Sequence, residues 1–272
     1  MKRAPLALAT FALLVGCSTF SSTDSPSPDG GGVADGGDPD GGASDGGGDA
    51  SKRFCEGFVP AKGSVLFCRD FDDSAPVNEG WDRVDIGPGR TLEIDKTTSI
   101  SPPGSLFSRL DANVTACASA QMERHIPGGL PAVTRVAFDV SVGGPSNDPF
   151  DGGRFFVLQI APTARLIFEV TQDGEQRWRV FAVIDPSQDF YELAKSPEMG
   201  KWGHFDITLR KATNDLQVNV DGMAAFGPSS LRTGFTAAGV KLDVSVGMEC
   251  EPAGKFARQV RMDNFVVVGS DD

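Results

Sequence analysis

The chain of 272 residues holds only one tyrosine and two histidines, and its five cysteines include no Cys-x-x-Cys pair. Too few imidazole and paired thiol groups remain for a zinc site built from histidine and cysteine. Nor does the sequence contain a serine nucleophile elbow, a phosphate-binding loop or a zinc-protease motif. These absences remove the enzyme classes that depend on such motifs.

Positive charge is also scarce, since 25 Lys and Arg stand against 37 Asp and Glu, for a net charge of −12. Nucleic acid and anionic lipid headgroups are bound through phosphate groups, which require a basic protein face. We therefore predict no nucleic-acid partner.

The apolar segment over residues 6–16 is too short for a membrane-spanning helix, which needs about 20 residues. It follows a basic start and ends at Cys17, the pattern of a secretory signal. Residues 14–17, Leu-Val-Gly-Cys, resemble the lipobox of bacterial lipoproteins. That resemblance implies cleavage before Cys17, acylation of this cysteine with fatty acids such as palmitate, and attachment to a membrane. Ser18 resembles the outer-membrane sorting pattern of Gram-negative lipoproteins.

Residues 17–52 follow the predicted signal peptide of residues 1–16 and repeat the triplet Asp-Gly-Gly among Ser and Pro. They offer almost no apolar surface to bury, so we predict a disordered tether. Calcium-binding β-roll repeats are the alternative, but these need a nonapeptide period that is missing here. Residues 53–272 are long enough for one sizeable all-β domain.

From residue 54 onward, period-two alternation and Gly- and Pro-containing turns indicate many short strands and no long helix. Residues 187–194 are interpreted as one short turn. We predict an all-β sandwich or jelly roll of two antiparallel sheets. The predicted strands cover residues 136–142, 155–160, 165–171, 177–184, 202–210, 216–221, 240–247 and 260–268.

Residues 200–209, Gly-Lys-Trp-Gly-His-Phe-Asp-Ile-Thr-Leu, lead into residues 216–222, Leu-Gln-Val-Asn-Val-Asp-Gly. This pair resembles the paired-strand signature of laminin G-like and concanavalin A-like domains. Residues 66–71 with Trp81 resemble the opening strand of that family, and residues 260–267 resemble its closing strand, which pairs back near the first. The resemblance implies a concanavalin A-like β-sandwich. It says little about chemistry, because the superfamily contains lectins, adhesion modules, glycosidases and lyases.

Four cysteines remain beyond Cys17, and four cysteines allow three pairings. Export from the cytoplasm favours disulfides. We predict a short loop closed by Cys55–Cys68 and a link between distant segments through Cys117–Cys250.

The glycosidase branch of the superfamily places acids at alternate positions of one strand, so that two carboxylates converge on one glycosidic oxygen. The nearest run here is Glu249-Cys250-Glu251, which Pro252 follows at once, and we interpret it as a polar strand end. The lyase branch needs a histidine or tyrosine base, but His125, His204 and Tyr191 have no recognisable partner in the sequence. We therefore predict no catalytic residues.

Along the predicted middle strands, every second residue is polar or aromatic, and these residues share one face of the sheet. In this superfamily the inner sheet is concave with one face in solvent. Such a face suits sugar hydroxyls, with aromatic rings against the apolar side of a sugar. A solvated face without a ligand is the alternative, because antiparallel sheets commonly leave one face wet. The predicted ligand-binding residues are Phe155, Gln159, Glu169, Arg177, Arg179 and Phe181.

Hard oxygen ligands occur beside both the first and the last predicted strand. Asp70 and Asp72 follow the first strand, and Asp263 and Asn264 lie on the last. If these strands pair, the four side chains come together as a calcium site. Simple solvation of these acids is the alternative, and the loop over residues 147–152 is a second candidate. We predict no other cofactor.

Together these features predict a lipid-anchored protein of the cell envelope, on the outer membrane of a Gram-negative bacterium. Its β-sandwich is predicted to bind an extracellular glycan or a surface protein without cleaving it. Two alternatives remain open. One is a divergent polysaccharide-cleaving enzyme, a glycosidase or lyase, on the same fold. The other is a structural or adhesion lipoprotein without a small ligand.

Overall fold

The computed structural model describes residues 53–114, 117–143, 152–172, 176–184, 187–231, 241–251 and 256–271. The predicted signal peptide, Cys17, the tether and most of the loop over residues 147–152 lie outside the described residues. No helix of the described part is long and apolar enough to cross a membrane.

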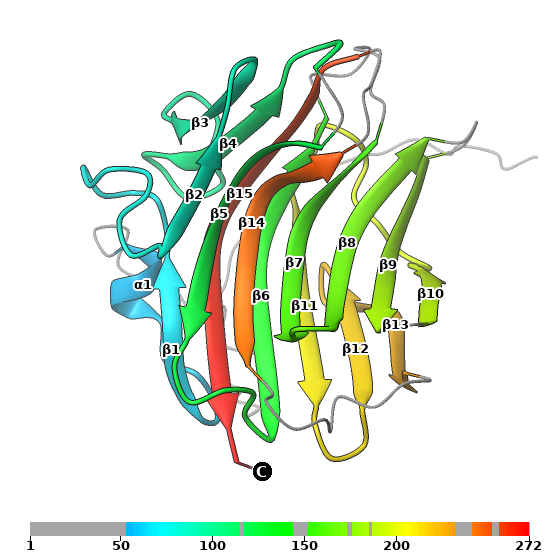
Figure 1. The fold of residues 1–272 in the computed structure, drawn as a ribbon. Helices are drawn as coiled ribbons and strands as arrows, with labels where there is room; N and C mark the ends of the chain where they lie inside the picture. Colours follow the sequence, from blue (N-terminus) through cyan, green and yellow to red (C-terminus); the bar gives the residue numbers. More distant parts are fainter. Residues whose placement is uncertain are drawn as a thin grey trace, which may run out of the picture. The chain divides into compact units, whose positions relative to one another are not determined.

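Two antiparallel sheets pack face to face (Figure 1), which confirms the all-β sandwich. In strand order, the first sheet contains β13 (Met223–Ser230), β12 (Asp215–Val220), β11 (Gly203–Arg210), β6 (Val133–Val142), β15 (Arg258–Ser270), β4 (Ser105–Leu110) and β3 (Arg90–Asp95), and β1 (Ser64–Arg69) pairs with β15. The second contains β10 (Ser187–Glu192), β9 (Gln176–Ile184), β8 (Ala164–Gln172), β7 (Gly153–Ala161), β14 (Leu242–Glu251), β5 (Ala118–Ile126) and β2 (Arg83–Ile86).

The predicted pairing of the first and last strands is confirmed, because β1 lies antiparallel to β15. Both predicted hairpins are present as the pairs β8–β9 and β11–β12. The predicted short turn over residues 187–194 is wrong. Residues 187–192 form the edge strand β10, which pairs with β9 and places Phe190 opposite Phe181.

The core lies between the sheets and is rich in aromatic rings. Phe138 of the first sheet stacks on Phe205 with ring centroids 5.5 Å apart, and it meets Phe156 of the second sheet at 4.8 Å. Phe265 on the last strand contacts both Phe138 and Phe156. All four side chains are fully buried. Because the ring contacts cross between the sheets, the two layers are held in one fixed arrangement.

Phe155 also lies in this core, which corrects its prediction as a ligand-binding residue. Its ring contacts Trp178 at 5.6 Å and Phe205 at 6.2 Å. The pairing of β7 with β8 shifts between Arg154 and Phe156. Such a bulge breaks the strict alternation of side chains, so two successive phenylalanines turn to the core.

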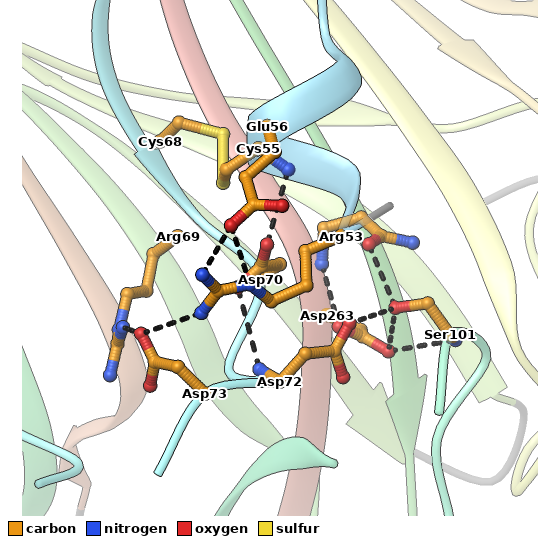
Figure 2. Close-up of a disulfide and its surroundings, with 11 residues drawn as sticks. Arg53, Cys55, Glu56, Cys68, Arg69, Asp70, Asp72, Asp73, Ser101 and Asp263 are labelled. Atoms are coloured by element: carbon orange, nitrogen blue, oxygen red, sulfur yellow. Dashed lines mark hydrogen bonds and ion pairs between the residues drawn. A yellow bond between two sulfur atoms is a disulfide. The ribbon is translucent and has the colours of Figure 1, made fainter. Parts of the chain in front are cut away.

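The N-terminal end of the described chain is fixed by a disulfide between Cys55 and Cys68 (Figure 2), as predicted. Cys55 lies in the short helix α1 (Phe54–Gly57), and Cys68 lies on β1. Phe54 and Phe58 pack against Val266 and Val268 on the side of the first sheet that faces away from the core. Cys117 also forms a disulfide, but the side chain of its predicted partner Cys250 lies outside the described residues.

Candidate functional site

The side of the second sheet that faces away from the core carries a set of aromatic, charged and amide side chains. Core and outward residues alternate along each strand, so the outward residues follow from the register. We call this side the outer face. It includes His125, Arg154, Val157, Gln159, Arg165, Ile167, Glu169, Arg177, Arg179, Phe181, Val183, Gln188, Phe190, Glu192, Asp243 and Glu249.

An aromatic pair marks the β9–β10 edge of the outer face. The rings of Phe181 and Phe190 are nearly parallel, 2° apart, with centroids separated by 4.3 Å. The Arg179 guanidinium lies over the Phe190 ring, 4.5 Å from its centroid. Phe181 is buried, whereas Phe190 is 52% exposed. The edge therefore presents the half-exposed ring of Phe190, which the Phe181 ring and the Arg179 guanidinium hold in place.

An arginine–glutamate network lies beside this pair. Arg154 Nε is 3.3 Å from Glu169 Oε2, and Arg179 Nε donates to Glu169 Oε1. Arg165 Nη1 donates to Glu249 Oε1 at 3.2 Å. Both glutamates are at least nine-tenths buried. Charged side chains at such depth are held rigidly by their partners.

A polar row crosses the outer face next to this network. In the register, Gln188, Val183, Arg165, Gln159, Asp243 and His125 lie side by side on six strands. A hollow of about 340 Å³ lies at one end of the row, lined by Gln159, Pro162, Thr163, Arg165, Val183, Ser187 and Gln188. All side chains of this row except that of Val183 carry hydrogen-bond donors or acceptors.

Both histidines have a carboxylate partner that the sequence did not reveal. His125 Nδ1 lies 2.6 Å from Oδ1 of the buried Asp243, which also pairs with Lys241. His204, on the first sheet, lies 2.8 Å from Asp139, and this hydrogen bond is the main cause of its raised pKa. Each partner is distant along the chain, so only the strand pairing brings the groups together.

Five of the six residues predicted to bind a ligand lie together on the outer face: Gln159, Glu169, Arg177, Arg179 and Phe181. Arg177 pairs with the exposed Glu192 of β10 at 3.1 Å. Sequence analysis missed Arg154, Phe190 and Glu249 as members of this site. Had residues 187–192 been recognised as a strand, their alternation alone would have placed Phe190 on this face.

An acidic cluster lies at the start of the first sheet (Figure 2), where three of the four predicted metal ligands meet around Ser101. The Ser101 Oγ lies 3.3 Å from Asp72 Oδ2, 3.1 Å from Asp263 Oδ2 and 2.9 Å from Asn264 Oδ1. The amide of Asn264 is oriented by a hydrogen bond from its Nδ2 to Asp139. A hydroxyl group has one proton, so three oxygen acceptors compete for a single donor.

Burial perturbs this acidic cluster. Asp263 is fully buried, and desolvation raises its pKa to about 7, against hydrogen bonds from Ser101 and Asn264 that lower it. Burial is likewise the first cause of the raised pKa of Asp72. The fourth predicted ligand, Asp70, accepts hydrogen bonds from the backbone of Cys55 and Asp72. It holds the N-terminal segment in place and does not reach Ser101.

In the described ranges, no three or more His, Cys, Asp or Glu side chains are grouped as a metal site. The cluster around Ser101 contains two such acids, together with an amide and a hydroxyl. Asp72 also lines a hollow of about 180 Å³. Carboxylate, amide and hydroxyl oxygens are the ligand types that calcium takes.

No family model matches the sequence. No curated protein matches it in sequence. Solved structures share the fold. An endo-β-1,4-glucuronan lyase from the fungus Trichoderma reesei superposes with a TM-score of 0.58 at 11% identity, over 76% of this chain and 96% of that one.

Two further structures superpose at similar levels. A cellulose-induced protein has a TM-score of 0.54 at 13% identity, over 75% of this chain and 97% of that one. A sialidase has a TM-score of 0.52 at 20% identity, over 78% of this chain but only 20% of the sialidase. At these identities the likeness shows a shared β-sandwich fold.

Proposed function

We propose that the outer face of the second sheet binds an extracellular glycan. The observation that carries this proposal is the half-exposed ring of Phe190, held by Phe181 and Arg179 beside buried, fixed polar groups. Sugars are amphipathic, and proteins bind them with an aromatic ring against the apolar side and fixed polar groups on the hydroxyls. Two of the structural neighbours, a glucuronan lyase and a sialidase, are by name proteins that act on glycans.

A glycan fits this face better than the alternative ligand, a surface protein. Protein-binding sites generally present a contiguous apolar patch of several hundred Å². Among the outer-face residues named above, Phe190 is the one large apolar side chain with substantial exposure. A buried apolar cluster of Val157, Ile167 and Phe181 lies beneath the rest of the face. The other side chains there belong to the polar row and the arginine–glutamate network, an arrangement suited to hydroxyl groups.

The substitution Phe190→Ala tests the proposal. We expect it to weaken glycan binding by about tenfold or more, since loss of 1.4 kcal/mol of contact energy corresponds to a factor of ten. The matched control is Met223→Ala, because Met223 is also 52% exposed but lies on β13, an edge strand of the first sheet. Binding of the full chain to β-1,4-glucuronan, polygalacturonate and cellohexaose is measured by calorimetry. Equal affinity of the two variants for a bound glycan would place the site elsewhere.

The lipid anchor is a second part of the proposal and rests on the lipobox resemblance at Cys17. Several acyl chains hold a protein firmly to a bilayer, whereas a single chain holds it only marginally. We expect Cys17→Ser to abolish incorporation of a labelled palmitate analogue during expression in a bacterial host. Ser18→Ala is the control and should retain the label. Labelling of the Cys17→Ser chain would contradict the anchor.

We also propose that Asp72, Asp263, Asn264 and the Ser101 hydroxyl hold a calcium ion. Three oxygen acceptors around one hydroxyl leave an excess of negative potential that a hard cation would neutralise. Bound there, the ion would tie β15 to the segments around residues 72 and 101, so its role is structural. Thermal unfolding in calcium and in chelator tests it.

A further inference from the structure

A third hollow lies on the first sheet, on the side that faces away from the core, so the sandwich separates it from the outer face. It has a volume of about 640 Å³, against about 340 Å³ for the hollow at the polar row. Its floor is formed by the neighbouring strands β11, β6 and β15, on which Thr208, Arg135 and Val268 lie side by side in the register. Pockets for small organic ligands typically have volumes of about 300–1,000 Å³, so this hollow is large enough to hold one.

One wall of this hollow is the chain segment over residues 60–62, which is fixed on both sides. Before it, the disulfide between Cys55 and Cys68 links helix α1 to β1. After it, Gly63 runs so close to β15 that a Cβ atom there would lie 2.2 Å from the carbonyl oxygen of Gly269. Ligand pockets are usually largely preformed, and a wall that is held in this way meets that condition.

The apolar part of the lining is aliphatic. The described residues that line the hollow include no aromatic ring, in contrast to the β9–β10 edge of the outer face, where Phe190 is half exposed. Proteins hold sugars against aromatic rings, so a sugar fits this hollow poorly. An alkyl chain gains free energy by leaving water for an aliphatic surface. The apolar lining residues are Pro60, Ala61, Ala132, Val133, Ala212 and Val268.

Arg210 is the cation of this hollow that lacks a close counter-charge. Arg135 also lines the hollow, but its Nε donates to Asp206 Oδ1 at 2.8 Å. The Arg210 side chain is partly buried and has no hydrogen-bond or ion-pair partner in the described part of the chain. Asp215 lies opposite Arg210 in the β11–β12 hairpin and attracts it from beyond ion-pair distance. The carboxylate of Asp215 is already hydrogen-bonded by Ser230, so Arg210 remains available to a ligand.

The chemistry of the lining favours a single carboxylate group on the ligand. The other two charged residues of the lining, Lys62 and Asp271, carry one charge of each sign. One available guanidinium matches the single charge of a carboxylate better than the charge of nearly two on a phosphate monoester. Arginine holds a carboxylate by two parallel hydrogen bonds. The hydroxyl groups of Thr208 and Thr213 also belong to the lining and are further donors.

We propose that this hollow binds an aliphatic carboxylate, that is, a fatty acid. Its carboxylate group lies on Arg210, and its alkyl chain lies on the aliphatic lining. The ligand is held without a covalent bond. Because the hollow and the outer face belong to different sheets, this site does not depend on the proposed glycan site.

Calorimetry on the full chain measures the binding of decanoate, below its micelle concentration, and of decanol, a neutral ligand with the same chain length. We expect decanoate to bind about tenfold more tightly or better, because it gains a charge-assisted pair with Arg210. Arg210→Met removes the charge and should weaken decanoate binding about tenfold, with decanol binding unchanged. The matched control is Arg109→Met, which should leave both affinities unchanged. Arg109 lies on β4 of the same sheet, outside the hollow, and pairs with the exposed Asp111.

A second variant and nuclear magnetic resonance locate the ligand. Ala212 is exposed in the turn between β11 and β12, so Ala212→Trp fills the hollow without disturbing the core and should weaken the binding of both ligands. In the unsubstituted protein, decanoate should shift the methyl resonances of Val133 and Val268. Those of Val157 and Ile167, on the outer face, should stay unchanged.

Several results would overturn the fatty-acid site. Absence of decanoate binding is one, and equal affinity for decanoate and decanol is another. Full decanoate affinity in Arg210→Met is a third, since retained decanol binding shows that this variant is folded. Decanoate shifts confined to Val157 and Ile167 would place the ligand on the outer face instead. None of these results bears on glycan binding, which Phe190→Ala tests separately.

Discussion

In chelator at pH 8, the Asp263→Asn protein should unfold at a higher temperature than the unsubstituted protein. Asp263 is fully buried and its carboxyl group, with a pKa of about 7, is ionised in the folded state at this pH. Burial of that charge next to Asp72 destabilises the fold, whereas asparagine is neutral at every pH. Oδ2 accepts three hydrogen bonds and Oδ1 only one, from the Asn264 backbone. The asparagine amide nitrogen in place of Oδ1 loses that one bond, at a cost of about 1 kcal/mol or more, which is smaller than the effect of the buried charge.

The size and the pH window of this effect follow from the raised pKa. The ordinary value is 3.8, so the folded state holds a proton that the unfolded state releases between about pH 4 and pH 7. Stability is therefore lost as pH rises through this window. The shift of about three units corresponds to about 4 kcal/mol, or roughly 10 °C in midpoint temperature for a domain of this size. Below pH 4, where the Asp263 carboxyl group is neutral, the advantage of the variant should disappear.

Calcium should narrow the difference between the two proteins. A bound cation compensates the carboxylate charge and stabilises the folded state by about 2.7 kcal/mol at 100 times its dissociation constant. Thermal unfolding is followed at pH 4 to 8, in chelator and in calcium. An unchanged midpoint on adding calcium would contradict the calcium site. Parallel pH profiles for the two proteins in chelator would contradict the burial of an ionised Asp263.

How far the sequence predicts the fold depends on how local each signal is. The alternation that predicts strands over residues 136–142 and 202–210 lies within single strands, and the structure confirms both as β6 and β11. In β10 the outward residues are largely polar and exposed, so the alternation is weak and only pairing with β9 makes the segment a strand. At Phe155 the bulge in β7 inverts the face. A bulge depends on the neighbouring strand, and the sequence of β7 alone carries no sign of it.

The site was predictable only in part for the same reason. The alternation of polar and apolar residues along β8 and β9 correctly placed Glu169, Arg179 and Phe181 on one face, because these residues lie within one hairpin. Glu249 belongs to a strand that pairs with β7, far along the chain. Its burial and its proximity to Arg154 arise from that pairing. The sequence shows it only as an acid before Pro252, which is the pattern of a strand end.

The second large effect concerns Arg154, which is the cation between the two buried glutamates. Replacement by methionine keeps most of the side-chain length and removes the charge from Glu169 Oε2 and Glu249 Oε2. Removing one partner of a buried ion pair typically costs about 3–5 kcal/mol. Arg179 and Arg165 remain beside the two carboxylates, so we expect a loss of about 3 kcal/mol in the free energy of unfolding at pH 8. Chemical denaturation measures it.

The control is Arg177→Met on the same face. Arg177 and Glu192 are both about half exposed or more, and exposed ion pairs contribute at most about 1 kcal/mol. The loss for Arg154→Met should shrink in acid, because protonation of Glu249, whose pKa burial already raises, removes one of the unpaired charges. It should also shrink in the double variant with Glu169→Gln. Equal losses for Arg154→Met and Arg177→Met at pH 8 would mean that the glutamates are not buried as ions.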